Sequence, residues 1–465
     1  MGRARYLGAG LVAIVMLLLT SCAPIINYGT APQKTTEDQM DEFLRAHEAT
    51  GAFMGSVLVA RGDQILLSRG YGMANLEHQA PNSAETVFRL GSLTKQFTAA
   101  AILQLQEQGL LKVTDTIDRY LRDYPRGGEI TIHQLLNHTS GIPDYVGAEV
   151  SSTAFRNSTS LDSLMATFSG KPLDFRPGSQ YQYSNSGYVV LTAIVEAVSG
   201  QRYADYLAEH IFRPLHMDAT SYEDSSTIVP HRAAGYSWDG TVYHNAEFID
   251  MSNPAGAGGL ITTVRDLYRW DRALYADEVL GAEMRQAYFT PTADMGPGAG
   301  YAYGWAVAEI SGREYDLHGG GINGFNTFVL RYPAEELYVV VLSNVESAPT
   351  QAIAQGLTAI ALGNPYDMPG QHSAVDVDPA TLERYTGLYQ VTPDVVVDVT
   401  TDSGRLYVQA SNQPRIEMQA ESKSQFYAQV NGMDVRVRFQ VGADGAATGL
   451  VIVQSGQELP AAKVK

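Results

Sequence analysis

Apolar and polar positions along the chain alternate with two different periods. A capping-box pattern at 36–39, TEDQ, predicts a helix that runs to about residue 49. Apolar runs at 55–60 and 64–69 flank Arg61-Gly62-Asp63 and predict a β-hairpin. From Ser92 to Gln108 apolar positions recur at helical spacing, and a glycine follows. The amino-terminal part therefore mixes strands and helices.

Helical spacing dominates the middle of the chain, and strand patterns return after it. Helices are expected at 161–168, 187–198, 202–211, 264–274 and 351–362. Strands are expected at 303–309, 326–332 and 337–344. Strands that flank a helical middle indicate an α+β fold, because a doubly wound sheet requires strict alternation of strand and helix.

The composition changes near residue 364. The segment 364–377 is rich in Pro, Gly, Asp and Ser and is typical of a linker. Short strand patterns then recur almost regularly, at 386–390, 395–400, 405–410, 425–429, 435–440 and 450–454. They predict an all-β barrel or sandwich. We therefore divide the chain into a signal segment at 1–21, a tether at 22–35, a large α+β domain at 36–363, a linker at 364–378 and a small all-β domain at 379–465.

Length and charge narrow the classes of protein. With 465 residues, two domains are expected. The formal net charge is −18, and −20 without the first 21 residues, which hold Arg3 and Arg5 and no acidic residue. Such a surface repels phosphate backbones, so nucleic-acid binding is not expected, and no polybasic membrane-binding patch is expected either.

The amino-terminal segment is typical of an export signal. Two arginines precede an apolar run at 7–19, which is short for a membrane-spanning helix. The sequence LTSC at 19–22 then resembles the lipobox of bacterial lipoproteins, in which the cysteine receives diacylglycerol. The chain has no other cysteine than Cys22, which excludes an internal disulfide. We expect a lipid anchor at Cys22 in the bacterial envelope, on the outer membrane where there are two membranes because Ala23 is not Asp; the alternative is an ordinary secreted protein.

Ser92 and Lys95 form the first candidate catalytic pair. Three residues apart on a helix, they share one face, and the amine is able to reach the hydroxyl. A serine needs an adjacent base to act as a nucleophile, and a desolvated lysine supplies one. S-x-x-K is a weak motif, and its alternative is an N-cap serine beside a surface lysine. The chain has only seven lysines, however, and contains this motif once.

Two further segments offer complementary chemistry. Tyr183 and Asn185 lie in a turn-like stretch before a predicted helix, where the phenol is able to pass protons and the amide to orient a carbonyl. The sequence HGGG at 318–321 lies between two predicted strands, where glycines allow close approach and free main-chain N–H groups. Taken alone, Tyr183 and Asn185 fit a packed aromatic and a capping asparagine better, because the chain has 27 tyrosines, and the HGGG segment fits a β-bulge or turn equally well.

Together the three motifs resemble those of the penicillin-recognising serine hydrolases: class C β-lactamases, DD-carboxypeptidases, D-aminopeptidases and family VIII esterases. The resemblance spans roughly 36–363 and includes LNHTSGIP at 136–143, FRPG at 175–178 and GGLITT at 258–263. It implies a β-lactamase/transpeptidase-like fold, an antiparallel sheet flanked by helices plus an all-helical subdomain. The segment 379–465 resembles the small lipocalin-like domain that follows the catalytic part in some relatives.

The same resemblance implies roles for individual residues. Ser92 is the implied nucleophile, and Lys95 and Tyr183 are the acid/base groups; which of them takes the serine proton stays open. Asn185, His318 and Gly320 are implied to bind substrate. The main-chain N–H groups of Ser92 and Gly321 are implied to form the oxyanion hole.

The third motif departs from the Lys-Thr-Gly of many β-lactamases in the family. Histidine is often uncharged near neutral pH, so a substrate carboxylate would be bound more weakly or in a pH-dependent way through His318. Peptidases and esterases of the family also use histidine here. We therefore expect ester or D-amino-acid amide cleavage, on a small-molecule or peptidoglycan-derived substrate, ahead of β-lactam hydrolysis.

Other classes fit the sequence less well. An α/β-hydrolase would carry G-x-S-x-G, which is missing from the sequence. His133 and His138 lack the partners of a zinc site and are interpreted as core or loop residues, so no metal or organic cofactor is expected. A catalytically silent envelope protein that binds cell-wall fragments or a partner protein is the main alternative.

Overall fold

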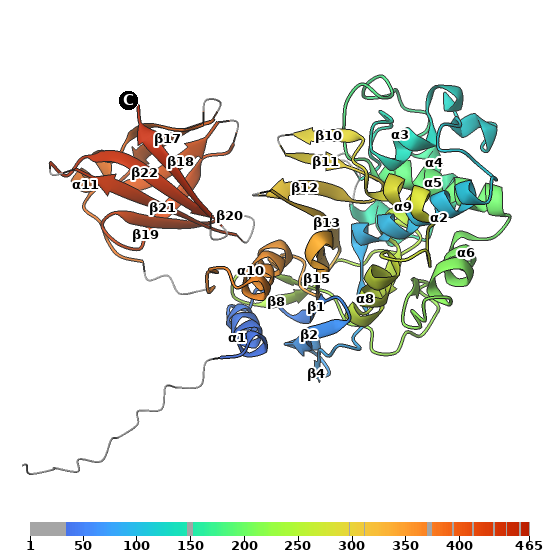
Figure 1. The fold of residues 1–465 in the computed structure, drawn as a ribbon, viewed down its shortest axis with the longest axis horizontal. Coiled ribbons are helices and arrows are strands. Elements are labelled where there is room, and N and C mark those ends of the chain that lie inside the picture. The colour runs from blue at the N-terminus through green and yellow to red at the C-terminus, as the bar shows by residue number, and fades with distance from the viewer. Residues whose placement is uncertain are drawn as a thin grey trace, which may run out of the picture. The chain divides into compact units, whose positions relative to one another are not determined.

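The largest sheet is antiparallel and joins the early strands β1 and β2 to the later strands β10 to β15. The structure, a computed structural model, describes residues 34–464 except 147–151, 297, 311, 370–373, 393–394, 412, 431–432, 443 and 455–456. The strand order is β10-β11-β12-β13-β14-β15-β1-β2 (Figure 1). The strands are β1 (Gly55–Arg61), β2 (Gln64–Tyr71), β10 (Ala293–Gly296), β11 (Ala299–Tyr301), β12 (Ala306–Ile310), β13 (Arg313–Ile322), β14 (Phe325–Tyr332) and β15 (Leu337–Ser343).

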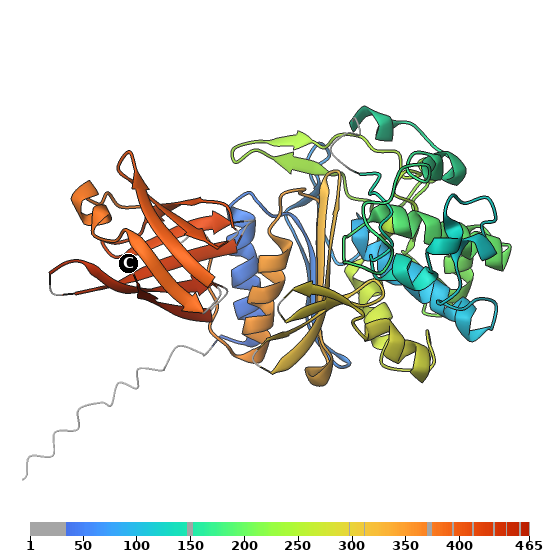
Figure 2. The ribbon, with the colours of Figure 1, turned by 90° about the horizontal axis from the view of Figure 1, so that it is seen from above.

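Strand β1 shows how this sheet is buried on both faces. Val57 and Val59 belong to one buried cluster, while Leu58 and Ala60 belong to another. Successive side chains of a strand point to opposite faces, so the nearly continuous apolar run serves two cores. Helices α1 (Thr36–Ala49) and α10 (Thr350–Leu362) cover one face, and α8 (Val264–Ala273) packs on the other (Figure 2).

A helical region packs on the same side of the sheet as α8. Its centre is α2 (Thr94–Glu107), which packs against α5 (Asn185–Ser199) and the short α7 (Ala255–Gly258). The predicted α+β, β-lactamase/transpeptidase-like architecture is confirmed. The remaining elements here are α3 (Ile132–Leu136), α4 (Leu161–Ala166), α6 (Tyr203–Leu207), α9 (Ala282–Phe289), β3 (Met73–Asn75), β4 (Ala80–Pro81), β5 (Phe88–Arg89), β6 (Ser221–Tyr222), β7 (Tyr236–Trp238), β8 (Tyr243–Asn245) and β9 (Leu260–Thr262).

The carboxyl-terminal part is a closed antiparallel barrel of eight strands. The sequence predicts six of them and misses β19 and β23, because β19 buries only Met418 and β23 contains Pro460, which weakens a strand pattern. A short helix, α11 (Pro379–Glu383), precedes the barrel. The strands are β16 (Gly387–Thr392), β17 (Val395–Asp402), β18 (Arg405–Ala410), β19 (Ile416–Ala420), β20 (Gln425–Val430), β21 (Met433–Val441), β22 (Ala447–Gln454) and β23 (Gln457–Lys463).

One placement inferred from the sequence is wrong. The glycines at 319–321 suggest a break between strands, but His318 to Gly321 lie inside β13 and pair with β14, Gly321 opposite Asn326. Glycine weakens a strand pattern, but it also marks places where another backbone comes close. Here that backbone is the turn that carries Ser92.

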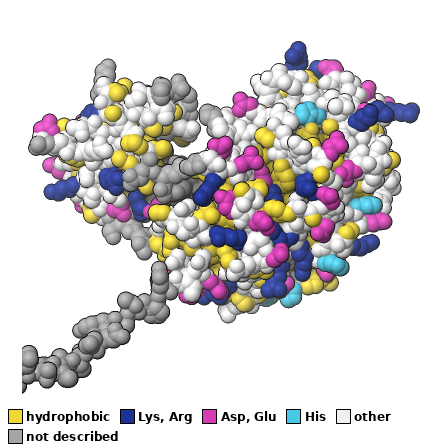
Figure 3. Space-filling view, viewed as in Figure 1, with side chains coloured by type: hydrophobic (Ala, Val, Ile, Leu, Met, Phe, Trp, Pro, Cys, Tyr) yellow, Lys and Arg dark blue, Asp and Glu magenta, His cyan; other side chains and the backbone are white. Residues whose placement is uncertain are grey.

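The helices in the described part of the chain and the charges on one face of the molecule bear on the question of a membrane. None of these helices is both long and apolar enough to cross a bilayer. On the face in Figure 3, basic and acidic side chains are interspersed, so that face carries no basic patch. Cys22 and the apolar run before it lie outside the described residues.

Candidate active site

Ser92 lies in a single 3₁₀ turn, Gly91–Leu93, between β5 and helix α2. Gly91 has φ of +54°, a conformation that costs glycine little and other residues more. A β-carbon at Gly91 would lie 2.9 Å from the main-chain nitrogen of Gly321. The turn therefore packs against β13, and Ser92 lies two residues before the first residue of α2, Thr94.

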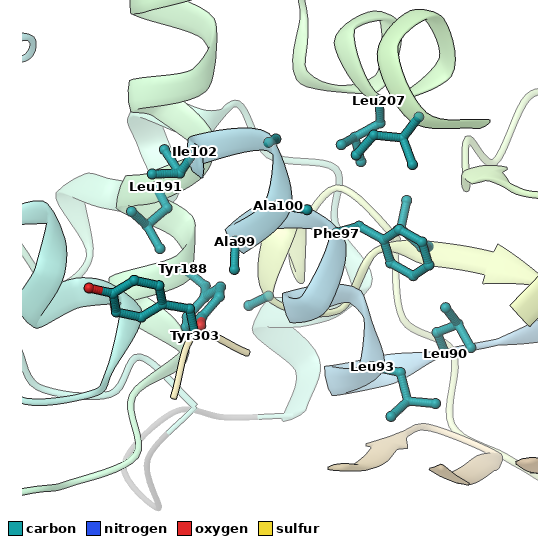
Figure 4. Close-up of a cluster of buried hydrophobic side chains, with 14 of the residues drawn as sticks. Leu90, Leu93, Phe97, Ala99, Ala100, Ile102, Tyr188, Leu191, Leu207 and Tyr303 are labelled. Atoms are coloured by element: carbon teal, nitrogen blue, oxygen red, sulfur yellow. The ribbon is translucent and has the colours of Figure 1, made fainter. Parts of the chain in front are cut away.

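Helix α2 is buried almost all round. Every residue from Thr94 to Leu103 is buried. Figure 4 shows Ala99 and Ile102 of this helix on the side of Tyr188 and Leu191 of α5, and Phe97 on the opposite side of the helix. A lysine side chain on such a helix has no path to water along which to extend its amine, so the amine of Lys95 remains inside.

The amine of Lys95 contacts three groups from three separate segments. Its Nζ lies 3.1 Å from Ser92 Oγ, 2.8 Å from Asn185 Oδ1 and 2.8 Å from the carbonyl oxygen of Ala257. Burial lowers the pKa of Lys95 to about 7, and the negative charge of Asp144 opposes part of this shift. Near neutral pH the amine is thus present in both its charged and its neutral form, beside the serine hydroxyl.

Asp144 is a site residue that the sequence analysis did not identify. Its two oxygens accept hydrogen bonds from the main-chain nitrogen and the side-chain Nδ2 of Asn185. With Nδ2 held this way, Oδ1 of the same amide faces Lys95. Asp144 directly follows the LNHTSGIP stretch, and this position is the only signal in the sequence that points to it.

Tyr183 lies over the amine of Lys95. The Lys95 Nζ is 4.8 Å from the centre of the Tyr183 ring. Burial raises the pKa of Tyr183 strongly, and the nearby Ser92 hydroxyl offsets part of the rise. The Tyr183 hydroxyl is buried and makes no hydrogen bond among the described residues. It is therefore an unused polar group whose pKa is affected by the Ser92 hydroxyl.

The ring of His138 packs against the ring of Tyr183. The two rings lie 4.2 Å apart, and the His138 Nδ1 accepts a hydrogen bond from the main-chain nitrogen of Ser184 at 3.2 Å. Burial lowers the pKa of His138 well below its usual value. His138 is thus a neutral core residue, as the sequence analysis interprets it, but it packs directly against the candidate site. His133, by contrast, bonds to Tyr303 and Asn137.

His318 is neutral and fully engaged. Its Nδ1 lies 2.7 Å from the carbonyl oxygen of Gly319, so Nδ1 carries the proton and donates it. Its Nε2 then accepts from the hydroxyl of Tyr301 at 2.9 Å. Burial lowers the pKa of His318 to about 4, with the charge of Lys95 acting in the same direction. The sequence analysis expects His318 to bind a substrate carboxylate in a pH-dependent way near neutral pH. Burial opposes this, because it keeps the ring uncharged at that pH.

Gly320 has no room for a side chain. A β-carbon at Gly320 would lie 2.1 Å from the carbonyl oxygen of Leu90, 2.3 Å from Thr327 Oγ1 and 3.2 Å from the main-chain nitrogen of Ser92. At Gly321, the next residue, a β-carbon would meet nothing within 4 Å. The main chain of β13 thus lies directly against the Ser92 turn, and open space begins at Gly321.

The structure brings seven of the predicted residues together: Ser92, Lys95, Tyr183, Asn185, His318, Gly320 and Gly321. The eighth, Cys22, lies outside the described residues. In the part of the chain that the structure describes, no three His, Cys, Asp or Glu side chains are grouped so as to share a metal ion. An amine, a phenol and two adjoining main-chain segments around one serine form a site for acyl transfer.

The comparison with known families agrees with this geometry. The family described as Beta-lactamase matches residues 36–362, and the one described as Domain of unknown function (DUF3471) matches residues 371–462. The chain belongs to the β-lactamase family of serine hydrolases.

Individual relatives share most of the chain. Penicillin-binding protein 4* of Bacillus subtilis (strain 168) is 33% identical over 437 residues, which cover 89% of this chain and 95% of the relative. A D-stereospecific amidohydrolase from Streptomyces sp. is 25% identical, with a TM-score of 0.61 over 70% of this chain and 99% of its own. The octameric penicillin-binding protein homologue from Pyrococcus abyssi has a TM-score of 0.64 at 22% identity, over 91% and 99%, and shows the shared fold.

Proposed function

We propose that the protein is a serine hydrolase that forms an acyl-enzyme on Ser92 and cleaves ester and D-amino-acid amide bonds. The observation that carries the proposal is the amine of Lys95, 3.1 Å from Ser92 Oγ, with a pKa that burial lowers to about 7. A base whose pKa lies near the working pH is the most effective one. Beside such a base, an ordinary serine becomes a nucleophile.

The hydrogen bonds of Lys95 support its assignment as the base. A neutral amine has two N–H bonds and one lone pair. Asn185 Oδ1 and the carbonyl oxygen of Ala257 only accept, so they take both N–H bonds. The lone pair is left for the hydroxyl of Ser92. Tyr183 remains the second acid/base group, since its hydroxyl is not used elsewhere among the described residues.

The reaction then runs in two halves. Ser92 Oγ bonds to the substrate carbonyl carbon while its proton passes to Lys95, and the oxyanion is bound by the main-chain N–H groups of Ser92 and Gly321. The bond to the leaving amine or alcohol breaks as that group takes the proton. A water molecule then attacks the acyl carbonyl, the acid is released, and Ser92 regains its proton.

The neutral state of His318 supports the choice of substrate. Both ring nitrogens are engaged, and the ring carries no charge near neutral pH, so His318 offers no cation to a β-lactam carboxylate. One of the similar structures is described as a D-stereospecific amidohydrolase, and the Bacillus subtilis relative is described as a penicillin-binding protein. We therefore rank ester and D-amino-acid amide cleavage above β-lactam hydrolysis.

Covalent labelling tests this proposal. After exposure to a fluorophosphonate, the intact mass of the native protein should rise by one adduct, and that of Ser92→Ala should not. A panel of p-nitrophenyl esters, D-Ala-D-Ala peptides and nitrocefin then ranks the substrates. Rapid nitrocefin turnover without ester or peptide cleavage reverses our ranking. Absence of any adduct supports the alternative, an envelope protein that binds cell-wall fragments or a partner protein without catalysis.

We also propose that Cys22 carries a lipid that anchors the protein in the bacterial envelope. The support is the LTSC sequence at 19–22 after an apolar run, with the chain's one cysteine in the position that lipidation requires. Cells that express the protein and are fed a tagged fatty acid should label the native chain. Cys22→Ala should lose the label and appear in the soluble fraction; equal labelling of both would refute the anchor.

A further inference from the structure

A cavity of about 190 Å³ lies beside the segment that carries Ser92. Among the residues that line it are Arg89 and Arg232. Arg89 precedes Ser92 by three residues, and Asn323, which also lines the cavity, follows Gly321 by two. Two residues of extended chain span roughly 7 Å. A substrate whose carbonyl lies at Ser92 and Gly321 is therefore able to reach into this cavity.

The two arginines share one buried carboxylate. Glu223, whose side chain is 1% exposed, accepts hydrogen bonds from Arg89 Nε at 2.8 Å and Nη2 at 3.0 Å, and from Arg232 Nη1 at 3.0 Å. The Arg232 side chain is 41% exposed, against 16% for Arg89. Arg232 is thus the guanidinium that faces the cavity with donors to spare.

The remaining charges at the cavity do not cancel this excess. Glu247 also lines the cavity, but it is paired with Arg156 at 3.6 Å. Two guanidinium groups against Glu223, together with this second pair, leave one net positive charge at the cavity. A planar guanidinium with unused N–H groups is the side chain best suited to bind a carboxylate.

The cavity walls also include apolar surface. The Arg89 guanidinium lies over the ring of Phe325, 5.7 Å from its centre, and Phe325 lines the cavity. Phe248, which also lines it, is 56% exposed. Large apolar side chains are usually covered, so this ring is available for contact with a ligand. The occupant that fits both features is a carboxylate on a short hydrocarbon segment.

We infer that this cavity binds a carboxylate on the substrate of Ser92, several atoms from the bond that is cleaved. The inference rests on the proposed function and deepens it, because it names a chemical group that the substrate carries. His318 is neutral and does not provide the cation for such a group. Arg232, held by Glu223 at the cavity, provides it instead.

Matched esters test the cavity. In the first pair the acyl part differs: mono-p-nitrophenyl glutarate carries a free carboxylate, and its methyl ester is neutral. In the second pair the leaving group differs: the acetate ester of 3-hydroxybenzoate carries a carboxylate, and the acetate ester of phenol is neutral. In Arg232→Gln, kcat/KM for at least one charged ester should fall about tenfold, while the neutral counterpart changes less than about twofold. Arg232→Lys, which keeps the charge without the planar fork, should fall between. Arg45→Gln, an exposed arginine paired with Asp41 on α1, is the control and should change neither.

Calorimetry with glutarate on the native protein separates this proposal from the proposed function. Hydrolysis of the esters with no change of the charged-to-neutral ratio in Arg232→Gln overturns the cavity proposal and leaves the proposed function standing. If no ester is hydrolysed, the proposed function fails and glutarate binding decides: binding that Arg232→Gln weakens supports the carboxylate site. Equal binding by both proteins, or none, overturns it.

Discussion

Asp144 accepts two hydrogen bonds from Asn185, one from its main-chain nitrogen at 3.1 Å and one from its side-chain amide nitrogen at 3.0 Å. Because the amide nitrogen bonds to Asp144, the amide oxygen of Asn185 faces Lys95. The same carboxylate raises the pKa of Lys95, against the larger effect of burial. One side chain thus governs both the orientation of a neighbour and the proton affinity of the amine.

Asp144→Asn should therefore move the pH dependence of the enzyme. Without the negative charge the pKa of Lys95 falls further, so the acid limb of kcat/KM shifts to lower pH. The plateau should drop about tenfold, because Asn185 loses a charged hydrogen-bond partner. A pH–rate profile with a p-nitrophenyl ester measures both. A limb that stays in place would show that Asp144 does not act on Lys95.

Lys95→Ala should remove that limb altogether. In the native enzyme kcat/KM rises as pH passes through about 7, because the amine must lose its proton to act as a base. The variant should lose about 10²–10⁴-fold in kcat/KM, as expected for a missing general base, while its far-UV circular dichroism is retained. Unchanged turnover would remove Lys95 from the mechanism.

His318→Gln should keep the inflexion near pH 7. Burial lowers the pKa of His318 to about 4, so this ring is already neutral well below the pH at which Lys95 titrates. The variant loses the bond from Tyr301, and a modest fall in rate without a shift of the limb is expected. A limb that disappears in His318→Gln, but persists in Lys95→Ala, would reverse the two assignments.

Two adjacent glycines provide a matched pair of variants. Gly320→Ala would place a methyl group 2.1 Å from the carbonyl oxygen of Leu90, so the strand and the serine turn must separate. At Gly319 the nearest atom to such a methyl group is 3.5 Å away, on the ring of Phe328. Gly320→Ala should lose about 100-fold or more in kcat, the scale of a damaged oxyanion hole. Gly319→Ala should stay within a few-fold, and equal effects of the two substitutions would contradict this account.

Tyr183 and Tyr188 should respond oppositely to loss of their hydroxyls. The hydroxyl of Tyr183 has no partner among the described residues, so Tyr183→Phe should leave the melting temperature nearly unchanged and lower kcat about 10²-fold. The hydroxyl of Tyr188 donates to the buried carbonyl oxygen of Leu136. Tyr188→Phe should cost about 1–3 kcal/mol of stability. Thermal melts and ester kinetics on both variants separate the two roles, and a Tyr183→Phe enzyme with native kcat would remove its phenol from the chemistry.

Local spacing predicts the parts of this site that depend on local geometry. Ser92 and Lys95 are three residues apart on one helical turn, and Tyr183 and Asn185 precede a clear helical pattern, so their placement follows from the sequence. For the glycines of the third motif the sequence alone predicts a break between strands, because a glycine run weakens a strand pattern wherever it occurs. Only the approach of the Ser92 turn explains why they belong to β13.

Partners from distant segments are the part that the sequence does not predict. Asp144 lies 41 residues from Asn185, and Arg232 lies 143 residues from Arg89. No periodic pattern connects such positions, since their contacts depend on how the segments cross in three dimensions. His138 is similar: its residue type predicts a buried histidine, but its contact with Tyr183 follows from the path of the chain alone.

The pairing of β1 with β15 has a consequence for how the protein is made. Gly55 aligns with Ser343, so an early hairpin waits for a strand synthesised almost 290 residues later. Strand β13 reaches β1 only through β14 and β15. Contacts between such distant positions form late, because a long loop must close first. Until the chain beyond residue 343 has been synthesised, β15 cannot join β1 to β14 and β13, so the sheet that holds β13 beside the Ser92 turn is completed late.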